Sequence, residues 1–374
     1  MIPVNTPRFE GNERAYLLEC IDTGWISSEG PFVKRFESEF ARVVDRKHGI
    51  AVANGSGALD IAVAAAKIGP GDEVIMPTFT IISPALSVVL AGATPVLIDS
   101  DPTTWNMDVS QIEAKITPKT KAIMVVHIYG LPVDMDPVID IAERHGLQII
   151  EDAAEMHGQT YKGRPCGSFG LMSTFSFYPN KHITCGEGGM VVTDDDAVAE
   201  HCRGLRNLCF QPQRRFVHEE LGWNYRMTNM QAALGLAQLE QLDEHVKKKR
   251  EIGAEYQRQL DDMPGIQLPL EKCEYADNIY WVFGLVLEES LGIDANDLMA
   301  KLGERKIGTR PFFWPMHEQP VFHKMGWYAD ERYPVAERLT RQGFYLPSGL
   351  GIDVGTIPRI SDEVHAIVRG PNSE

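Results

Sequence analysis

A lysine between two short apolar runs is the residue of this chain best suited to covalent chemistry. It lies in the stretch Thr174-Phe-Ser-Phe-Tyr-Pro-Asn-Lys-His-Ile-Thr-Cys-Gly-Glu-Gly-Gly189. The pattern predicts a buried strand over Thr174–Tyr178, a break at Pro179, Lys181 on a tight loop and a second strand over Met190–Thr193. Desolvation among apolar side chains favours the neutral, nucleophilic amine that a Schiff-base lysine needs. An isolated lysine is more often a surface residue, so other parts of the chain must decide.

A glycine-rich turn, Asn54-Gly-Ser-Gly-Ala58, stands between an apolar run and a helical pattern. The free amides of a helix N-terminus, together with the hydroxyl of Ser56, are suited to binding a phosphate group. Taken alone, a turn of this kind is more often a turn without a ligand.

An acidic residue follows a predicted buried strand in Glu151-Asp-Ala-Ala-Glu155. Asp152 is expected at the strand end, where an unpaired carboxylate is costly and needs a cation or strong donors. The ordinary alternative is a helix cap or a structural ion pair. Pyridoxal phosphate needs amides and hydroxyls for its phosphate, an acid for its ring nitrogen and an amine for its aldehyde. The turn, the acid and the lysine therefore predict a pyridoxal phosphate site.

The elements that must position these residues alternate between strands and helices from His48 onward. The predicted strands are Ile50–Ala53, Glu73–Met76, Thr94–Asp99, Ala122–His127 and Leu147–Asp152, and the predicted helices are Gly57–Lys67, Ser83–Ala91, Asp108–Ile116 and Met135–His145. Strands that are apolar throughout predict an α/β fold, with a mainly parallel central sheet flanked by helices. Ligands gather at the carboxyl ends of such strands, where the turn at residues 54–57, His127 and Asp152 fall.

The last third of the chain no longer alternates regularly between strands and helices. A long helical pattern covers Met230–Leu260, and an apolar strand (Ile279–Leu287), a helix (Asp294–Arg305) and the irregular stretch 310–317 follow. We therefore expect a large cofactor-binding domain over residues 1–240 and a smaller α+β domain over residues 241–374. The expectation leaves open that the first ~20 residues pack on the small domain.

The composition excludes several classes of protein. The chain has 374 residues and a net charge of −16, and its longest basic run is Lys247-Lys-Lys-Arg250. A nucleic-acid partner is therefore not expected. No apolar run approaches the roughly 18 residues of a membrane span. Scattered cysteines and an N-terminus without a signal sequence predict a cytoplasmic protein. The histidines lack paired-ligand spacing, so no metal is expected.

Further motifs are spread along the chain: Gly24-Trp-Ile-Ser-Ser28, Gly69-Pro-Gly-Asp-Glu-Val-Ile75, Gly92-Ala-Thr-Pro-Val96, Val126-His-Ile-Tyr-Gly130, and Gly222-Trp-Asn-Tyr-Arg-Met-Thr-Asn229 with Gln231-Ala-Ala-Leu-Gly-Leu-Ala-Gln238. With the turn, the acid and the lysine, they resemble the sugar-nucleotide aminotransferases among the fold-type I pyridoxal phosphate enzymes, essentially end to end. Within that family the likeness is greatest to the GDP-perosamine synthases. It rests there on Trp25-Ile-Ser-Ser28, Asn180-Lys181, Asp152 with Glu155, and Arg310-Pro with Pro315-Met-His317.

The resemblance implies a role for each of eleven residues. Lys181 would form an imine with the cofactor, and Asp152 would hold the protonated ring nitrogen. Phosphate binding would fall to Ser56, Gly57 and Ser176, with Asn224 reaching over from the other subunit of a homodimer. Glu155 would lie beside the cofactor on the substrate side, where Trp25 and His317 are further substrate candidates, and Arg226 could bind the carboxylate of the amino donor. The eleventh is Ile81.

Family members stack an aromatic side chain on the cofactor ring at the position of Ile81, and this chain departs from that pattern. Its segment reads Phe79-Thr-Ile-Ile82. Either Ile81 packs on the ring by apolar contact, or a shift brings Phe79 to it.

The resemblance also implies a reaction. The amino group of glutamate would move to the C4 keto group of a nucleotide-linked 4-keto-6-deoxy sugar, GDP-4-keto-6-deoxymannose giving GDP-perosamine, in a homodimer with its active sites at the interface. Relatives with histidine instead of Lys181 dehydrate their sugar. A UDP- or dTDP-linked 3- or 4-keto sugar is the alternative substrate, and a cofactor-bound homologue without turnover is a distant one. The chain has no GxGxxG that opens a helix, which disfavours a dehydrogenase.

Overall fold

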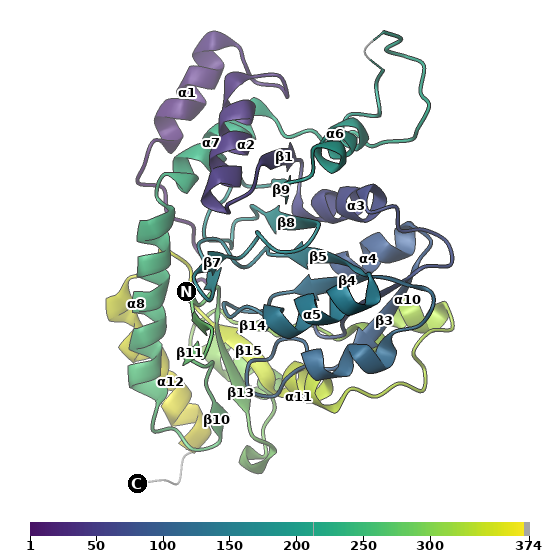
Figure 1. The fold of residues 1–374 in the computed structure, drawn as a ribbon. Helices are drawn as coiled ribbons and strands as arrows, with labels where there is room; N and C mark the ends of the chain where they lie inside the picture. Colours follow the sequence, from purple (N-terminus) through teal and green to yellow (C-terminus); the bar gives the residue numbers. More distant parts are fainter. Residues whose placement is uncertain (212, 370–374) are drawn as a thin grey trace.

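The computed structural model describes residues 1–211 and 213–369, which form a large sheet between two layers of helices and a smaller sheet beside it (Figure 1). Within these residues, no helix combines the length and the apolar character needed to cross a bilayer.

The large sheet has seven strands in the order β1-β9-β8-β5-β4-β2-β3. All of them run in one direction except β9, which is antiparallel to both of its neighbours. This arrangement confirms the predicted α/β class with a mainly parallel sheet. The strands are β1 (His48–Val52), β2 (Glu73–Pro77), β3 (Thr94–Ile98), β4 (Thr120–Val126), β5 (Gln148–Asp152), β8 (Met172–Ser176) and β9 (Gly189–Thr193).

Alternate side chains of these strands enter two separate cores. In β2, Val74 and Met76 join the core under one helical layer, and Ile75 joins the core under the other. Strands buried on both faces need apolar residues at consecutive positions, which is why these runs do not alternate with polar residues. The first layer holds α3 (Gly55–Ala65), α4 (Ile82–Leu90) and α6 (Asp196–Leu205), and the second holds α2 (Pro31–Val43), α5 (Met135–His145) and α7 (Asn229–Leu239).

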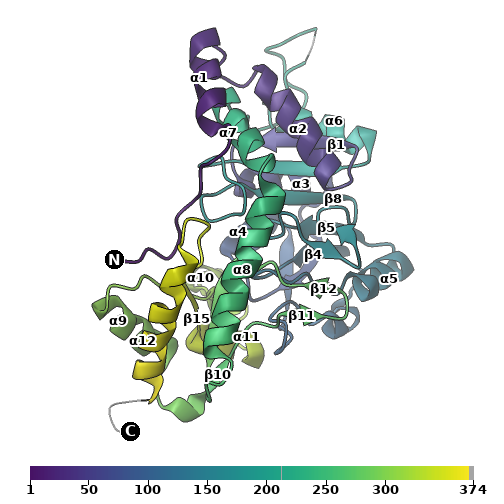
Figure 2. The ribbon, with the colours of Figure 1, turned by 90° about the vertical axis from the view of Figure 1, so that its left-hand side faces the viewer.

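The C-terminal part forms a third core between helices and a four-stranded antiparallel sheet of order β10-β13-β15-β14. The long helix α8 runs beside α12 along its edge (Figure 2). The elements are α8 (Leu242–Leu260), β10 (Ile266–Gln267), β13 (Phe283–Leu287), α9 (Ala295–Glu304), β14 (Arg310–Pro311), α10 (Pro320–Lys324), α11 (Pro334–Gln342), β15 (Gly343–Leu346) and α12 (Ile357–Arg369). Two short hairpins pair β6 (Thr160–Tyr161) with β7 (Arg164–Pro165), and β11 (Lys272–Cys273) with β12 (Ala276–Asp277).

The N-terminal segment runs along the C-terminal part before it reaches α1 (Glu13–Thr23). The Ile2 N–H donates to the carbonyl of Lys306 (2.8 Å), and the Gly351 N–H donates to the carbonyl of Thr6 (2.8 Å). Residues of β13, α10 and α11 also belong to the core of the large sheet. A boundary near residue 240 coincides with the break between α7 and α8, and the division into residues 1–240 and 241–374 stays a prediction.

Three predicted elements differ from the structure. The predicted helix over residues 108–116 is wrong, because two 3₁₀ turns, Val109–Gln111 and Glu113–Lys115, stand there. Asp108 does cap the first turn, but Gln111 also accepts a hydrogen bond from the Asp99 N–H (3.1 Å), which ties the turn to the sheet. The long pattern over residues 230–260 is two helices. The strand predicted from residue 279 begins at Phe283, because Tyr280 has a φ of +48°.

Candidate active site

A cavity of about 540 Å³ opens at the carboxyl ends of the parallel strands. The turn between β1 and α3, the loop between β2 and α4, and the ends of β4, β5 and β8 form its walls, and segments of the C-terminal part close it. Its lining includes Asn54, Gly55, Ser56, Thr80, Ile81, Ser83, Asp152, Glu155, Thr174, Ser176, Asn180, Lys181, Trp281, Phe313 and Tyr345. Twelve of these fifteen residues come from the first half of the chain, where the chemistry was predicted.

Lys181 follows β8 on a tight turn, in which its N–H donates to the carbonyl of Tyr178 (2.9 Å). Its Nζ lies 3.9 Å from Glu155 Oε1 and 4.1 Å from the ring centre of Trp281. Burial lowers the pKa of the Lys181 amine, and the charges of Glu155 and Asp152 oppose that shift. A larger share of the amine is therefore neutral and nucleophilic than in an exposed lysine.

Asp152 is the last residue of β5, and 4% of it is exposed. In the described part of the chain its carboxylate accepts one hydrogen bond, from the Ala154 N–H (3.1 Å). Burial raises the pKa of Asp152, while that hydrogen bond and the charge of Lys181 act to lower it. A buried carboxylate that faces a cavity with so few donors is suited to a cationic ligand group.

Glu155 lies beside Lys181 and is also buried. Its Oε2 accepts a hydrogen bond from the Tyr129 N–H (2.7 Å). Burial raises the pKa of Glu155 to about 8, although Lys181 and the Tyr129 amide act in the opposite direction. Glu155 therefore favours its protonated form near neutral pH.

The turn before α3 brings hydroxyls together at the N-terminus of that helix. Ser56 Oγ and Ser83 Oγ are 2.9 Å apart, and Ser176 lines the same wall at the end of β8. Gly55 is required there, since an added Cβ would lie 2.7 Å from the Cβ of Ser176. The Gly57 N–H donates to the capping side chain of Asn54 (2.8 Å). That amide is already used inside the helix cap, so the phosphate role predicted for Gly57 has no free donor in this arrangement.

Three buried polar atoms of the lining have no hydrogen-bond partner among the described residues. They are Thr80 Oγ1, Thr174 Oγ1 and Asn180 Oδ1. A buried polar group without a partner costs free energy, so these atoms indicate that the cavity binds a polar ligand.

The geometry separates the two alternatives for the residue that packs on the cofactor ring. Ile81 lines the cavity and is 50% exposed. Phe79 is fully buried against Tyr129 and Phe312, with ring centres 6.0 Å apart in both pairs. Ile81 is therefore the better placed of the two, and its contact with a ring stays a prediction.

Besides Gly57, four predicted residues lie outside the lining of this cavity. Trp25 is half exposed on the loop after α1, and Asn224 is exposed as well. Arg226 hydrogen bonds to Asn207 in a separate surface hollow. His317 is buried, with its Nδ1 2.8 Å from Thr78 Oγ1 and its Nε2 3.3 Å from Glu337 Oε1. These contacts give His317 a structural part in this chain, and its predicted substrate role stays untested.

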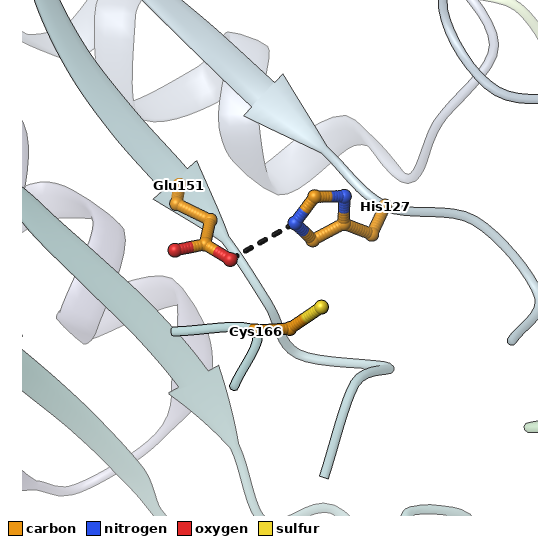
Figure 3. Close-up of side chains that lie close together, drawn as sticks. All are labelled: His127, Glu151 and Cys166. Atoms are coloured by element: carbon orange, nitrogen blue, oxygen red, sulfur yellow. Dashed lines mark hydrogen bonds and ion pairs between the residues drawn. The ribbon is translucent and has the colours of Figure 1, made fainter. Parts of the chain in front are cut away.

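The third strand-end candidate, His127, belongs to a buried group with Glu151 and Cys166 (Figure 3). The Val133 N–H donates to its Nδ1 (3.0 Å), so its Nε2 carries the proton and donates to Glu151 (3.0 Å). Burial would raise the pKa of Glu151, but hydrogen bonds from His127, two amides and a hydroxyl lower it on balance. Since these polar atoms already have partners, the group serves the packing of the sheet and offers no open site to a metal.

Sequence reasoning did not find the residues that reach the cavity from the C-terminal part. Trp281, Phe313 and Tyr345 stand in no local motif, and they reach the cavity through the packing of distant segments. Ser83 could have been predicted, because its hydroxyl stands at the start of α4, in the same strand-to-helix context as Ser56.

Comparison with known proteins decides the family. The model of the DegT/DnrJ/EryC1/StrS aminotransferase family matches residues 7–365. This chain belongs to that family. The GDP-perosamine synthase of Caulobacter vibrioides is 45% identical to this aminotransferase over 359 residues, 96% of each protein. The enzyme of the same name from Escherichia coli O157:H7 is 42% identical over 93% of each protein.

Among solved structures, Streptomyces venezuelae DesV in complex with a ketimine intermediate is similar with a TM-score of 0.89 and 34% identity, over 98% of this chain and 100% of that chain. The family uses pyridoxal phosphate, as the sequence predicted. The lining fits that cofactor, because it provides a buried amine, a buried carboxylate and hydroxyls at a helix N-terminus.

Proposed function

We propose that this aminotransferase moves the amino group of glutamate to the C4 keto group of GDP-4-keto-6-deoxymannose and so forms GDP-perosamine. The observation that carries the proposal is that Lys181 and Asp152 face one cavity, in a chain that is 45% identical to a GDP-perosamine synthase over 96% of both. The net change is balanced, since glutamate leaves as 2-oxoglutarate and the keto sugar leaves as the amino sugar.

The residues that would hold the cofactor follow from the lining. Lys181 would bind its aldehyde carbon, and Asp152 would accept a hydrogen bond from its protonated ring nitrogen. Ser56 and Ser176 would bind its phosphate at the N-terminus of α3, and Ile81 would pack against its ring. When bound, pyridoxal phosphate supplies an acceptor for the amino group and a ring that draws electrons from the bond that breaks.

The side chain of Lys181 would also move protons. Its lowered pKa lets Nζ act as a general base, which takes the proton from the α-carbon of glutamate. In the second half of the reaction, Nζ would deliver a proton to the sugar carbon that receives the nitrogen. Glu155 would keep its proton near neutral pH and so add no second negative charge beside Asp152.

A homodimer would complete the site. Asn224 is exposed and lies outside the cavity of its own chain, as expected for a residue that binds the phosphate in the partner subunit. Trp25 and Arg226 are also outside the lining, and we propose that they act on the substrate and the donor carboxylate across the same interface.

The test offers the purified protein glutamate together with GDP-, UDP- or dTDP-linked 4-keto-6-deoxy sugars, and dTDP- or UDP-linked 3-keto sugars. Mass spectrometry follows the amino sugar, and a coupled assay follows 2-oxoglutarate. The proposal predicts the highest kcat/KM for the GDP sugar and no product with Lys181→Ala. A higher kcat/KM for a UDP or dTDP sugar would assign the alternative substrate. Absence of product from every sugar would favour a homologue without turnover.

A further inference from the structure

The loop that carries Lys181 is held by side chains from three distant segments. The carbonyl oxygens of residues 179, 180 and 182 accept hydrogen bonds from Asn5 (3.0 Å), Trp281 (2.9 Å) and His245 (2.8 Å) respectively. Trp281 differs from the other two in also contacting the amine, since Lys181 Nζ lies 4.1 Å from the centre of its indole ring. One side chain therefore touches both the lysine and the backbone beside it.

Trp281 is itself fixed on several sides. It is 4% exposed, and its ring stacks on that of Tyr129 with centres 5.8 Å apart and an angle of 17° between the planes. Its carbonyl accepts a hydrogen bond from Lys249 Nζ (2.8 Å), which also donates to the carbonyl of Ser348 (2.5 Å). The indole is thus a rigid surface against which the lysine side chain is placed.

The indole acts on the amine in two opposing ways. Its bulk excludes water from Nζ, which favours the neutral amine. The negative face of its ring attracts the ammonium form, because a cation above an aromatic face is stabilised by the ring quadrupole. A leucine would still exclude part of the water but would offer no ring face, so the two effects can be separated by substitution.

We propose that Trp281 is a positioning residue for Lys181: its N–H fixes the loop at residue 180, and its ring face holds Nζ in the cavity. The inference rests on the proposed function, in which Lys181 is the amine that binds the cofactor. It extends that function to a residue about 100 positions away in sequence, contributed by the segment before β13.

The groups that face the amine set the background for any pH measurement. Burial lowers the pKa of Lys181, and the negative charges of Glu155 and Asp152 oppose it. His157 lies near enough for the charge of Lys181 to help lower its pKa, which burial lowers first, to about 3. The cavity also contains Glu187 and Tyr345. Glu155 titrates within the range of the measurement, so the profiles are also compared in a Glu155→Gln background, where the remaining shift reports the loss of the indole.

The experiment measures how fast pyridoxal phosphate attaches to the full-length protein after its own cofactor has been removed. Absorbance gives the second-order rate between pH 6 and 10, and the profile yields a limiting rate at high pH and the apparent pKa of the amine. Trp281→Leu removes the ring face and the N–H. Trp281→Phe keeps a ring face without the N–H. Phe312→Leu removes a ring of the same aromatic cluster, 4.6 Å from Tyr129, that does not line the cavity.

We expect Trp281→Leu to lower the limiting rate at least tenfold. It should also lower the apparent pKa by about one unit, because the leucine still excludes water from the amine but offers the ammonium form no ring face. Trp281→Phe should lower the limiting rate by about threefold and leave the pKa in place, and Phe312→Leu should change neither. If Trp281→Leu does not fold, Trp281→Met takes its place, since methionine also lacks both the ring face and the N–H.

Wild-type values for both Trp281 variants would overturn the proposal. Equal effects of Trp281→Leu and Phe312→Leu would overturn it as well, because the indole would then only fill space. If the wild-type protein attaches no cofactor at all, the proposed function fails first, and this inference fails with it.

Discussion

Three carboxyl groups near the end of β5 show how position alone assigns their chemistry. Glu151 points into the packed side of the sheet, where hydrogen bonds lower its pKa on balance. Asp152, one residue later, faces the cavity on the other side. Glu155 lies in the turn beyond the strand, where burial raises its pKa to about 8. The alternation of side chains along β5 separates the structural acid Glu151 from Asp152, and the turn after the strand brings Glu155 to the same cavity.

A first prediction concerns the protonation of Glu155. Its pKa in the folded protein is raised above the usual 4.5 to about 8, so its protonated form stabilises the fold below about pH 4.5 and that stability is lost as the pH rises through 8. Glu155→Gln keeps an acceptor for the Tyr129 N–H and cannot ionise. From pH 5.5 to pH 9, the free energy of unfolding of the variant should therefore rise by at least about 1 kcal/mol relative to that of the wild type.

Urea unfolding of the cofactor-free protein at these two values of pH measures the difference. If the free energies of unfolding of Glu155→Gln and wild type change equally between the two values of pH, Glu155 is ionised at both.

At the scale of elements, the start of α3 depends on its close approach to β8. An added Cβ on Gly55 would lie 2.7 Å from Ser176 Cβ, a contact that the two elements can relieve by moving apart. Because both carry proposed phosphate-binding groups, Gly55→Ala should weaken pyridoxal phosphate binding at least tenfold. Gly303→Ala is a matched control, since the space around Gly303 in α9 is open. Fluorescence titration measures both, and equal affinities would contradict this part of the site.

Lys249 joins α8 to the segment before β13, and its protonation predicts how the stability of the fold depends on pH. Burial lowers the pKa of Lys249 to about 7. The unfolded chain then binds more protons than the folded one between about pH 7 and pH 10, so the contribution of Lys249 to stability rises with pH in that window. Lys249→Met removes this dependence. From pH 7 to pH 9, the free energy of unfolding of the wild type should therefore rise by about 2 kcal/mol relative to that of the variant.

Chemical unfolding at both values of pH checks the sign as well as the size. A gap that stays constant, or that moves in favour of the variant at high pH, would show that Lys249 keeps its charge when buried.

Much at this scale was predictable from the sequence. Uniformly apolar runs between amphipathic helices predict a parallel sheet, and the sheet then brings the turn at Ser56 and the carboxylate of Asp152 to one edge. The predicted helix over residues 108–116 was wrong because the same capping residue can begin either kind of helix, and Asp108 caps a 3₁₀ turn. Trp281 and Tyr345 could not be predicted, because nothing near them in the sequence records which cavity they reach.

At the scale of the whole molecule, the proposed homodimer makes a prediction about mixed subunits. If Asn224 serves the partner's site, Lys181→Ala and Asn224→Ala subunits fail separately, but a hybrid dimer combines one intact lysine with one intact asparagine. A 1:1 mixture that exchanges subunits should recover about one quarter of wild-type activity, since half of the dimers are hybrids with one complete site of two. Activity no higher than that of the two separate variants would place Asn224 in its own chain's site or in none.

The central claim is that the amine of Lys181 is the group that binds pyridoxal phosphate, and it has a direct measurement. Borohydride reduction of the protein as purified with its cofactor, followed by proteolysis and mass spectrometry, locates the pyridoxyl group on the sequence. The account predicts one modified residue, Lys181, and loss of the modification in Lys181→Ala. A pyridoxyl group on another lysine such as Lys249, or none on the protein, would contradict it.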